Sequence, residues 1–161
     1  MENKDIKKLY DSHSLSIMHT AEETIVKGQN RLEEIKSFAR KANMKCIGIA
    51  HCVSFSKEAE AVSQFLSDEF KVVKVDCKYG RHTKEEILGK EGSGIMCNPA
   101  GQAEYLKEAG TEMNLSMGLC VGHDMVFNSK SASPVTALAI KDRVHRQNPL
   151  ETIREIMPKE E

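Results

Sequence analysis

The 161-residue chain has no long apolar run, no excess of one charge and no closely spaced pair of cysteines. No stretch approaches the length of a transmembrane helix, and residues 1–8 lack the apolar core of a signal peptide. We therefore expect a cytoplasmic protein that does not insert into a membrane. The chain carries 23 basic and 24 acidic side chains, so its formal net charge is -1. This balance predicts neither nucleic acid nor a membrane surface as a partner.

Internal repeats, low-complexity tracts and linkers are also absent from the sequence. The length suits one domain that can bury a normal core without disulfides or structural metals. Polar residues with apolar positions at helical spacing predict an N-terminal helical arm over residues 1–29. Residues 30–157 are expected to form the α/β core of the domain.

Four short apolar stretches alternate with helix-like patterns in this core. We expect them to be strands at residues 46–50, 71–75, 115–120 and 135–140. Strands that alternate with helices imply a parallel sheet with right-handed crossovers. The sequence thus predicts a three-layer, Rossmann-like or flavodoxin-like α/β domain. Its sheet should be mostly parallel and four-stranded, in the order 2-1-3-4, with helices on both faces.

Several helix starts carry specific signals. Asn30 precedes Glu33 by three residues, as in a capping box, and Asn98 precedes Pro99 as an N-cap precedes a first-turn proline. Asn148 is expected to begin a last helix. Its apolar positions are expected to face inward at Leu150, Ile153 and Ile156.

The segment 78–96 carries four glycines, so we expect mostly loop with one helical turn after Thr83. A loop of this length within a compact domain is usually functional or mobile. The segment is therefore a second region, besides the strand ends, in which to look for function.

Four of the five cysteines are predicted to meet at one edge of the sheet. Cys52, Cys77 and Cys120 end or follow strands, and Cys97 precedes a helix that should begin at the same edge. In open α/β sheets, ligands bind outside the carboxyl ends of the strands. We therefore expect a sulfur-lined site there. Cys46 begins the first strand at the opposite edge, and we expect it to be a small buried hydrophobe.

Thiolates are soft ligands that select zinc, copper(I) or iron–sulfur clusters. The Cys-x-x-Cys pairs of zinc fingers and the ferredoxin spacings are both absent, so the cysteines resemble an enzyme site assembled from loops. Three of them can hold a cluster with one open iron, as in a non-redox enzyme that desulfurates or dehydrates a small substrate. Four can close a zinc site, and the sequence leaves both open. The predicted metal ligands are Cys52, Cys77, Cys97 and Cys120.

Polar residues beside these cysteines are the candidates for catalysis. His123 and Asp124 would line the open side of the site, although Asp124 equally suits the N-cap of a helix. Lys141 and Arg143 follow the fourth strand and either bind an anionic substrate or are surface charges. Asn98 is expected to be a helix cap first and a cofactor contact second.

Two alternatives need no metal. In the first, Cys97 near a helix N-terminus is a nucleophile with a lowered pKa, His123 is its base and Asp124 orients the base, or two neighbouring thiols form a redox pair. In the second, the domain is a non-catalytic binding module whose cysteines are buried and inert. In every case the expected ligand is a small molecule or a metal, and the domain can form a homo-oligomer.

Three motifs resemble a known family. They are Met96-Cys-Asn-Pro-Ala-Gly-Gln102, Gly118-Leu-Cys-Val-Gly-His-Asp124, and Pro134-Val-Thr followed by Lys141-Asp-Arg-Val144. The chain from about residue 31 to residue 150 is similar to an uncharacterised family from anaerobic bacteria and archaea whose members are described as metal-binding. The resemblance implies metal binding by the matched cysteines and implies no particular activity.

Overall fold

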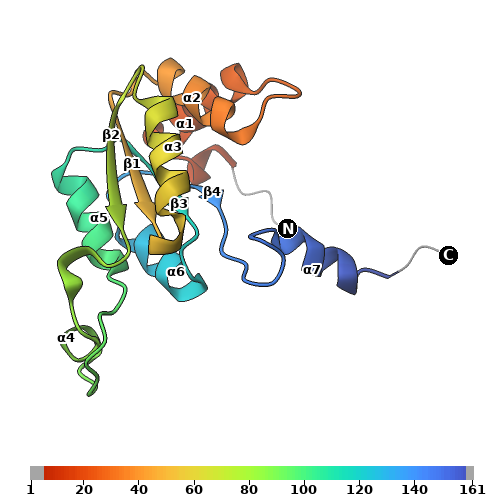
Figure 1. Cartoon of the computed structure of the whole chain (residues 1–161). Helices are drawn as coiled ribbons and strands as arrows, with labels where there is room; N and C mark the ends of the chain where they lie inside the picture. The colour runs from red at the N-terminus through yellow and green to blue at the C-terminus, as the bar shows by residue number, and fades with distance from the viewer. Residues whose placement is uncertain (1–5, 159–161) are drawn as a thin grey trace. The chain divides into compact units, whose positions relative to one another are not determined.

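The computed structural model describes residues 6–158 (Figure 1). The chain folds into two compact units. The first unit ends at Met44 and the second begins at Lys45. The helix predicted after Asn30 therefore groups with the N-terminal helix, and the sheet lies wholly in the second unit. None of the helices in residues 6–158 has the length and apolar character needed to cross a bilayer.

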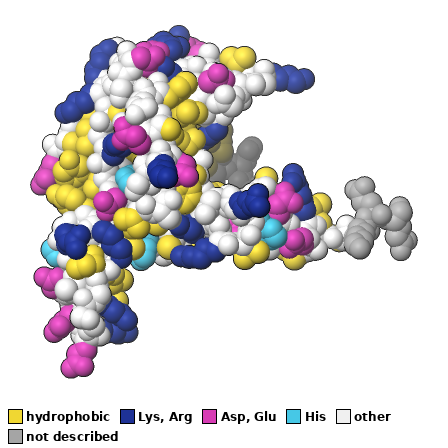
Figure 2. Space-filling view, in the orientation of Figure 1, with side chains coloured by type: hydrophobic (Ala, Val, Ile, Leu, Met, Phe, Trp, Pro, Cys, Tyr) yellow, Lys and Arg dark blue, Asp and Glu magenta, His cyan; other side chains and the backbone are white. Residues whose placement is uncertain are grey.

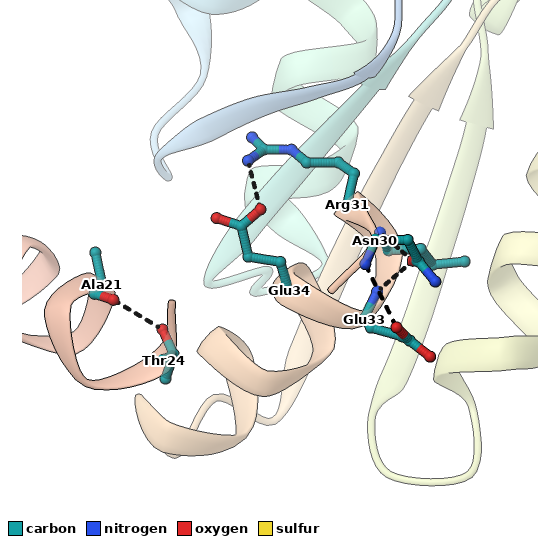
Figure 3. A network of polar contacts seen from close by, with 7 residues as sticks. Ala21, Thr24, Asn30, Arg31, Glu33 and Glu34 are labelled. Carbon is teal, nitrogen blue, oxygen red and sulfur yellow. Dashed lines mark hydrogen bonds and ion pairs between the residues drawn. The ribbon is translucent and has the colours of Figure 1, made fainter. Parts of the chain in front are cut away.

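In its described part, residues 6–44, the first unit contains two α-helices with well-defined starts. Asp11 caps the first of them by accepting a hydrogen bond from the Ser14 N–H at 2.7 Å. Asn30 accepts hydrogen bonds from two backbone N–H groups, and Glu33 reaches back to the Asn30 N–H, so the predicted capping box is confirmed (Figure 3). The elements of this unit are η1 (Ile6–Leu9), α1 (Ser12–Thr24) and α2 (Arg31–Lys41).

The second unit is built on four parallel strands in the order β2-β1-β3-β4, which confirms the predicted sheet (Figure 1). The strands are β1 (Cys46–His51), β2 (Lys71–Asp76), β3 (Met113–Met117) and β4 (Val135–Ala139). The α-helices are α3 (Ser56–Leu66), α4 (Lys84–Leu88), α5 (Pro99–Glu108), α6 (Val121–Lys130) and α7 (Pro149–Ile156). The short 3-10 helices are η2 (Val53–Phe55) and η3 (Tyr79–Arg81).

Helices cover both faces of this sheet (Figure 1). Ala50 of β1 packs in one cluster with Leu106 of α5 and Phe127 of α6. Successive strand side chains point to opposite faces, so the fully buried Ile47 and Ile49 face the side that α3 covers. A continuous apolar strand such as β1 is expected where both faces are covered.

The carboxyl ends of β1 and β2 are joined by one buried side chain. The Nε2 group of Gln102, from the first turns of α5, donates to the carbonyl of His51 at 3.3 Å and to that of Val75 at 3.0 Å. Gln102 is fully buried. A helix from one face of the sheet therefore fixes the spacing of two strand ends at the edge where the cysteines lie.

The end of the third strand differs from the prediction. We expected the strand to run to Cys120 and to turn at Gly122, whereas it ends at Met117 and turns at Gly118. Gly118 has φ +64, and a Cβ atom there would lie 2.1 Å from the ring of Phe55. Only glycine fits this conformation and this close approach. An apolar run does not reveal such a turn, because the residues after it are apolar as well.

The last helix begins at Pro149 as predicted, but the prediction for its apolar side chains is wrong. Leu150, Ile153 and Ile156 are 53%, 49% and 77% exposed. Their spacing indicates a helix with one apolar face and does not indicate what that face contacts.

A thiol rim as the candidate functional site

Four cysteines lie just beyond the carboxyl ends of the strands, and we call them the thiol rim: Cys52, Cys77, Cys97 and Cys120. Cys52 directly follows β1, Cys77 directly follows β2, and Cys97 comes one residue before the N-cap of α5. Cys120 is the N-cap residue of α6. Cys46 is buried at the start of β1, at the opposite edge, as the sequence predicts.

Two thiols of the rim are in contact. The sulfur atoms of Cys77 and Cys97 lie 3.6 Å apart, and the Asn98 N–H donates to the Cys77 carbonyl at 2.8 Å, which holds the two segments together. Burial, together with the neighbouring thiols of Cys97 and Cys52, raises the pKa of Cys77 to about 12, against the opposing effect of a hydrogen bond from the Val53 N–H. Cys77 is therefore a neutral thiol at physiological pH.

Cys52 has the opposite surroundings. Its sulfur accepts hydrogen bonds from Ser54 Oγ at 3.2 Å and from Lys141 Nζ at 3.5 Å, and Lys141 also donates to Ser54 Oγ at 2.7 Å. Burial raises the pKa of Cys52, but the hydrogen bonds from Ser54 and the charge of Lys141 together outweigh burial, so the pKa lies below its ordinary value. The Lys141 ammonium is 4.9 Å from the centre of the Phe55 ring, which further fixes its position.

Cys120 also has a cationic partner, because Arg143 donates to its sulfur at 3.2 Å. The loop that carries Lys141 and Arg143 is shaped by Asp142, whose carboxylate accepts the N–H groups of Val144 and His145 at 2.8 and 3.1 Å. These hydrogen bonds lower the pKa of Asp142. Both cations predicted near the fourth strand therefore contact thiols, and their predicted role toward an anionic substrate stays a prediction.

A cleft of about 330 Å³ opens beside Cys97. His123, in the first turn of α6, lines it together with Cys97. Two lysines of the segment 78–96, Lys78 and Lys84, line it too. The rest of its wall comes from Gly94, Ile95 and Met96.

Asp124 does not occupy the N-cap position that was one of its two predicted roles, whereas Asn98 is the helix cap that the sequence predicts. Asp124 lies inside the first turn of α6 and is not its N-cap, and its carboxylate forms no hydrogen bond with His123 or a thiol in the described residues 6–158. Asn98 caps α5, because its side-chain oxygen accepts the Gly101 N–H at 2.9 Å and its amide donates to the Tyr79 carbonyl at 3.3 Å. Both polar ends of Asn98 therefore have structural partners.

Sequence reasoning missed three residues at this edge. Ser54 lies two positions after Cys52, a spacing that could have indicated it as a hydrogen-bonding partner of the thiol. Lys78 and Lys84 belong to the segment in which the sequence predicts mostly loop and a possible function, but no local pattern distinguishes them from surface lysines.

The sulfur atoms of the thiol rim are the kind of ligand that a soft metal prefers, but only two of them are spaced as they would be around one ion. Two thiolates bound at about 2.3 Å to one tetrahedral ion lie about 3.8 Å apart, close to the 3.6 Å between Cys77 and Cys97. In residues 6–158, however, no three His, Cys, Asp or Glu side chains are arranged to hold a metal ion. Cys77 and Cys97 are therefore spaced as two ligands of one ion, but no third ligand from residues 6–158 is positioned beside them.

The fold and this edge define a class of protein, an α/β domain with a parallel four-stranded sheet and thiols at its carboxyl edge. The chain belongs to the family described as protein of unknown function DUF1847, whose sequence model matches residues 1–138. It is 40% identical over 131 residues to an uncharacterized protein of Methanocaldococcus jannaschii, MJ0455, a match that covers 79% of this chain and 68% of that protein. No solved structure matches the chain. The resemblance to an uncharacterised family is thus confirmed, and metal binding stays a prediction.

Proposed function

We propose that the thiol rim carries out cysteine chemistry and that Cys52 is its reactive thiolate. The observation that carries the proposal is the contact of the Cys52 sulfur with both Ser54 Oγ and Lys141 Nζ. The thiolate is the nucleophilic form of cysteine, and reactive cysteines lie in electropositive, partly exposed surroundings. Cys52 is partly exposed, and its pKa is lowered.

Cys77 and Cys97 supply a dithiol in this proposal. Two thiols with their sulfurs 3.6 Å apart need little movement to form a disulfide. The Cys52 thiolate attacks one sulfur of a disulfide substrate and releases the first product thiol, and Cys97 then attacks the Cys52 sulfur and releases the second. Cys77 attacks the Cys97 sulfur, which frees Cys52 and leaves a Cys77–Cys97 disulfide. The dithiol thus loses two electrons and two protons, and the substrate leaves as two thiols. The reaction class is therefore thiol–disulfide exchange with a small substrate. Such a protein needs reduced thiols at rest, which is why we place it in the cytoplasm.

The test is the rate at which each cysteine reacts with iodoacetamide in the native, reduced protein at pH 7, without oxygen and with a chelator. Peptide mass spectrometry gives one rate for each cysteine. We expect Cys52 to react fastest and the buried Cys46 and Cys77 to react slowly. A Cys52 that reacts no faster than Cys46 would refute the proposal.

A second candidate is the binding of zinc or an iron–sulfur cluster, and the spacing of Cys77 and Cys97 favours it. These two residues would hold the metal, with Cys52 or Cys120 completing the set after a change of rotamer. A bound zinc would supply a Lewis acid, and a cluster with an open iron would bind an oxygen or sulfur of a substrate.

Metal and acid-labile sulfide analysis of protein purified without oxygen tests this candidate. We expect Cys77→Ala and Cys97→Ala to lose the metal, whereas Cys46→Ala, a matched change at the opposite edge, keeps it. Equal metal content in all three variants, or no iron and no zinc in the native protein, would refute metal binding by the thiol rim.

A further inference from the structure

We propose that the cleft beside Cys97 binds a small organic anion and delivers it to the thiol rim. This inference rests on the proposed cysteine chemistry and names its substrate class. The cleft places one thiol, Cys97, and one imidazole, His123, in the same wall as two lysines. Lys141 and Arg143, which contact Cys52 and Cys120, are not among the residues that line the cleft.

The charge of the cleft indicates the ligand. Neither Lys78 nor Lys84 forms an ion pair with a carboxylate of residues 6–158, and Lys78 Nζ is held by a hydrogen bond of 2.6 Å to the Ile95 carbonyl. The nearby Glu86 carboxylate is already engaged by the Thr83 N–H. Figure 2 shows Lys, Arg and His side chains gathered where the segment that carries α4 meets the rest of the second unit. An anionic group is the partner that such a wall attracts.

The size and the remaining wall limit the ligand further. About 330 Å³ is at the low end of the volumes of small-molecule sites. Ile95 and Met96, with the aliphatic stems of the lysines, offer apolar contacts. The ligand is therefore a small molecule with an apolar body and one anionic group, such as a short carboxylate.

The wall is preorganised by its backbone. Thr83 and Ile95 form an antiparallel bridge, and the N–H groups of Lys84 and Met96 donate to carbonyls across the segment at 3.1 and 2.8 Å. The Thr83 hydroxyl accepts the Glu86 N–H, so α4 begins with a capping box. These bonds hold the backbone of Lys84 in place, which reduces the ordering of the wall that binding requires.

Two alkylating reagents of similar size test the charge preference. Iodoacetate is anionic and iodoacetamide is neutral, and with either one the Cys97 thiolate attacks the methylene carbon and iodide leaves. The quantity measured is the ratio of the two rates at Cys97, from peptide mass spectrometry. We expect Lys84→Met to lower the ratio about threefold and the double change with Lys78→Met to lower it further, with the effect weakening at high salt. Lys107→Met, a surface lysine of α5 paired with Glu104, is the matched control.

A ratio at Cys97 that does not change in the lysine variants would overturn the inference, as would a Cys97 that reacts with neither reagent. The single Lys84→Met variant, on the surface of α4, keeps the test valid if the double variant does not fold. The rates at Cys52 are read on a separate peptide of the same samples. A slow Cys52 with a charge-selective Cys97 would refute the proposed function and leave the cleft as an anion site.

Discussion

Removal of the Lys141 charge should raise the pKa of Cys52 by an amount that follows from Coulomb's law. The ammonium lies 3.5 Å from the sulfur, and Cys52 is partly exposed. At a dielectric constant near that of water, opposite charges at this distance attract by about 1.2 kcal/mol. This energy corresponds to about 0.9 pKa unit, so the Lys141→Met change should raise the pKa of Cys52 by about one unit.

The effect on the reaction rate is smaller than the effect on the pKa, and it changes sign with pH. A thiol with a higher pKa is less ionised at pH 7 but is intrinsically more nucleophilic, with a Brønsted coefficient of about 0.4–0.5. We therefore expect Lys141→Met to slow iodoacetamide alkylation of Cys52 about threefold at pH 7. Above both pKa values the variant should react about twofold faster than the native protein.

The assay is the pH–rate profile of Cys52 alkylation between pH 5 and pH 11, followed on its own peptide. Lys107→Met is the control, because Lys107 is exposed, is paired with Glu104 and forms no hydrogen bond with a thiol of residues 6–158. Ser54→Ala should move the pKa in the same direction, since it removes the other hydrogen bond to the sulfur. Superimposable profiles for the native protein and Lys141→Met would refute the role of the lysine.

Three further predictions concern stability. The pKa of Cys77 in the folded protein, about 12, exceeds its ordinary value of 9.0, so the stability that the buried neutral thiol contributes is complete below pH 9 and is lost as pH rises toward 12. Chemical denaturation should show that the free energy of unfolding falls by up to about 1.4 kcal/mol per pH unit in this range, and Cys77→Ala should reduce this fall. An unchanged slope in the variant would contradict the raised pKa. Gly118→Ala should cost about 2 kcal/mol or more in the free energy of unfolding, whereas Gly94→Ala, with open space around it, should cost little, and equal effects would exclude the strained turn. Asn98→Ala should cost about 1 kcal/mol through loss of the α5 cap, and a neutral result in urea unfolding would show that the cap does not stabilise the helix.

The sheet could be predicted from the sequence because its strands are short apolar runs between helix patterns. The run from Cys46 to Ala50 has no charged residue, as expected of a strand buried on both faces. The same signal failed at the end of β3, because Leu119 continues the apolar run after the chain has turned at Gly118. The contacts of α7 could not be predicted, since helical spacing carries no information about a partner.

The placement of the cysteines could be predicted, and their chemical partners could not. Parallel strands put their carboxyl ends at one edge, so the topology alone brings Cys52 and Cys77 together. The cysteine that each cation reaches depends on the loop after β4, which Asp142 shapes through hydrogen bonds to its own backbone neighbours. Local sequence does not determine the conformation of such a loop. The sequence alone therefore could not show whether Lys141 contacts a substrate or is a surface charge.

The buried amide of Gln102 ties α5 to the backbone segments that carry two of the thiols. It donates to the carbonyls of His51 and Val75, which lie one residue before Cys52 and two residues before Cys77. Cys97 comes shortly before the start of the same helix. A substitution that shifts α5 on the sheet would therefore move the backbone beside three of the four thiols together, even if it touched none of them.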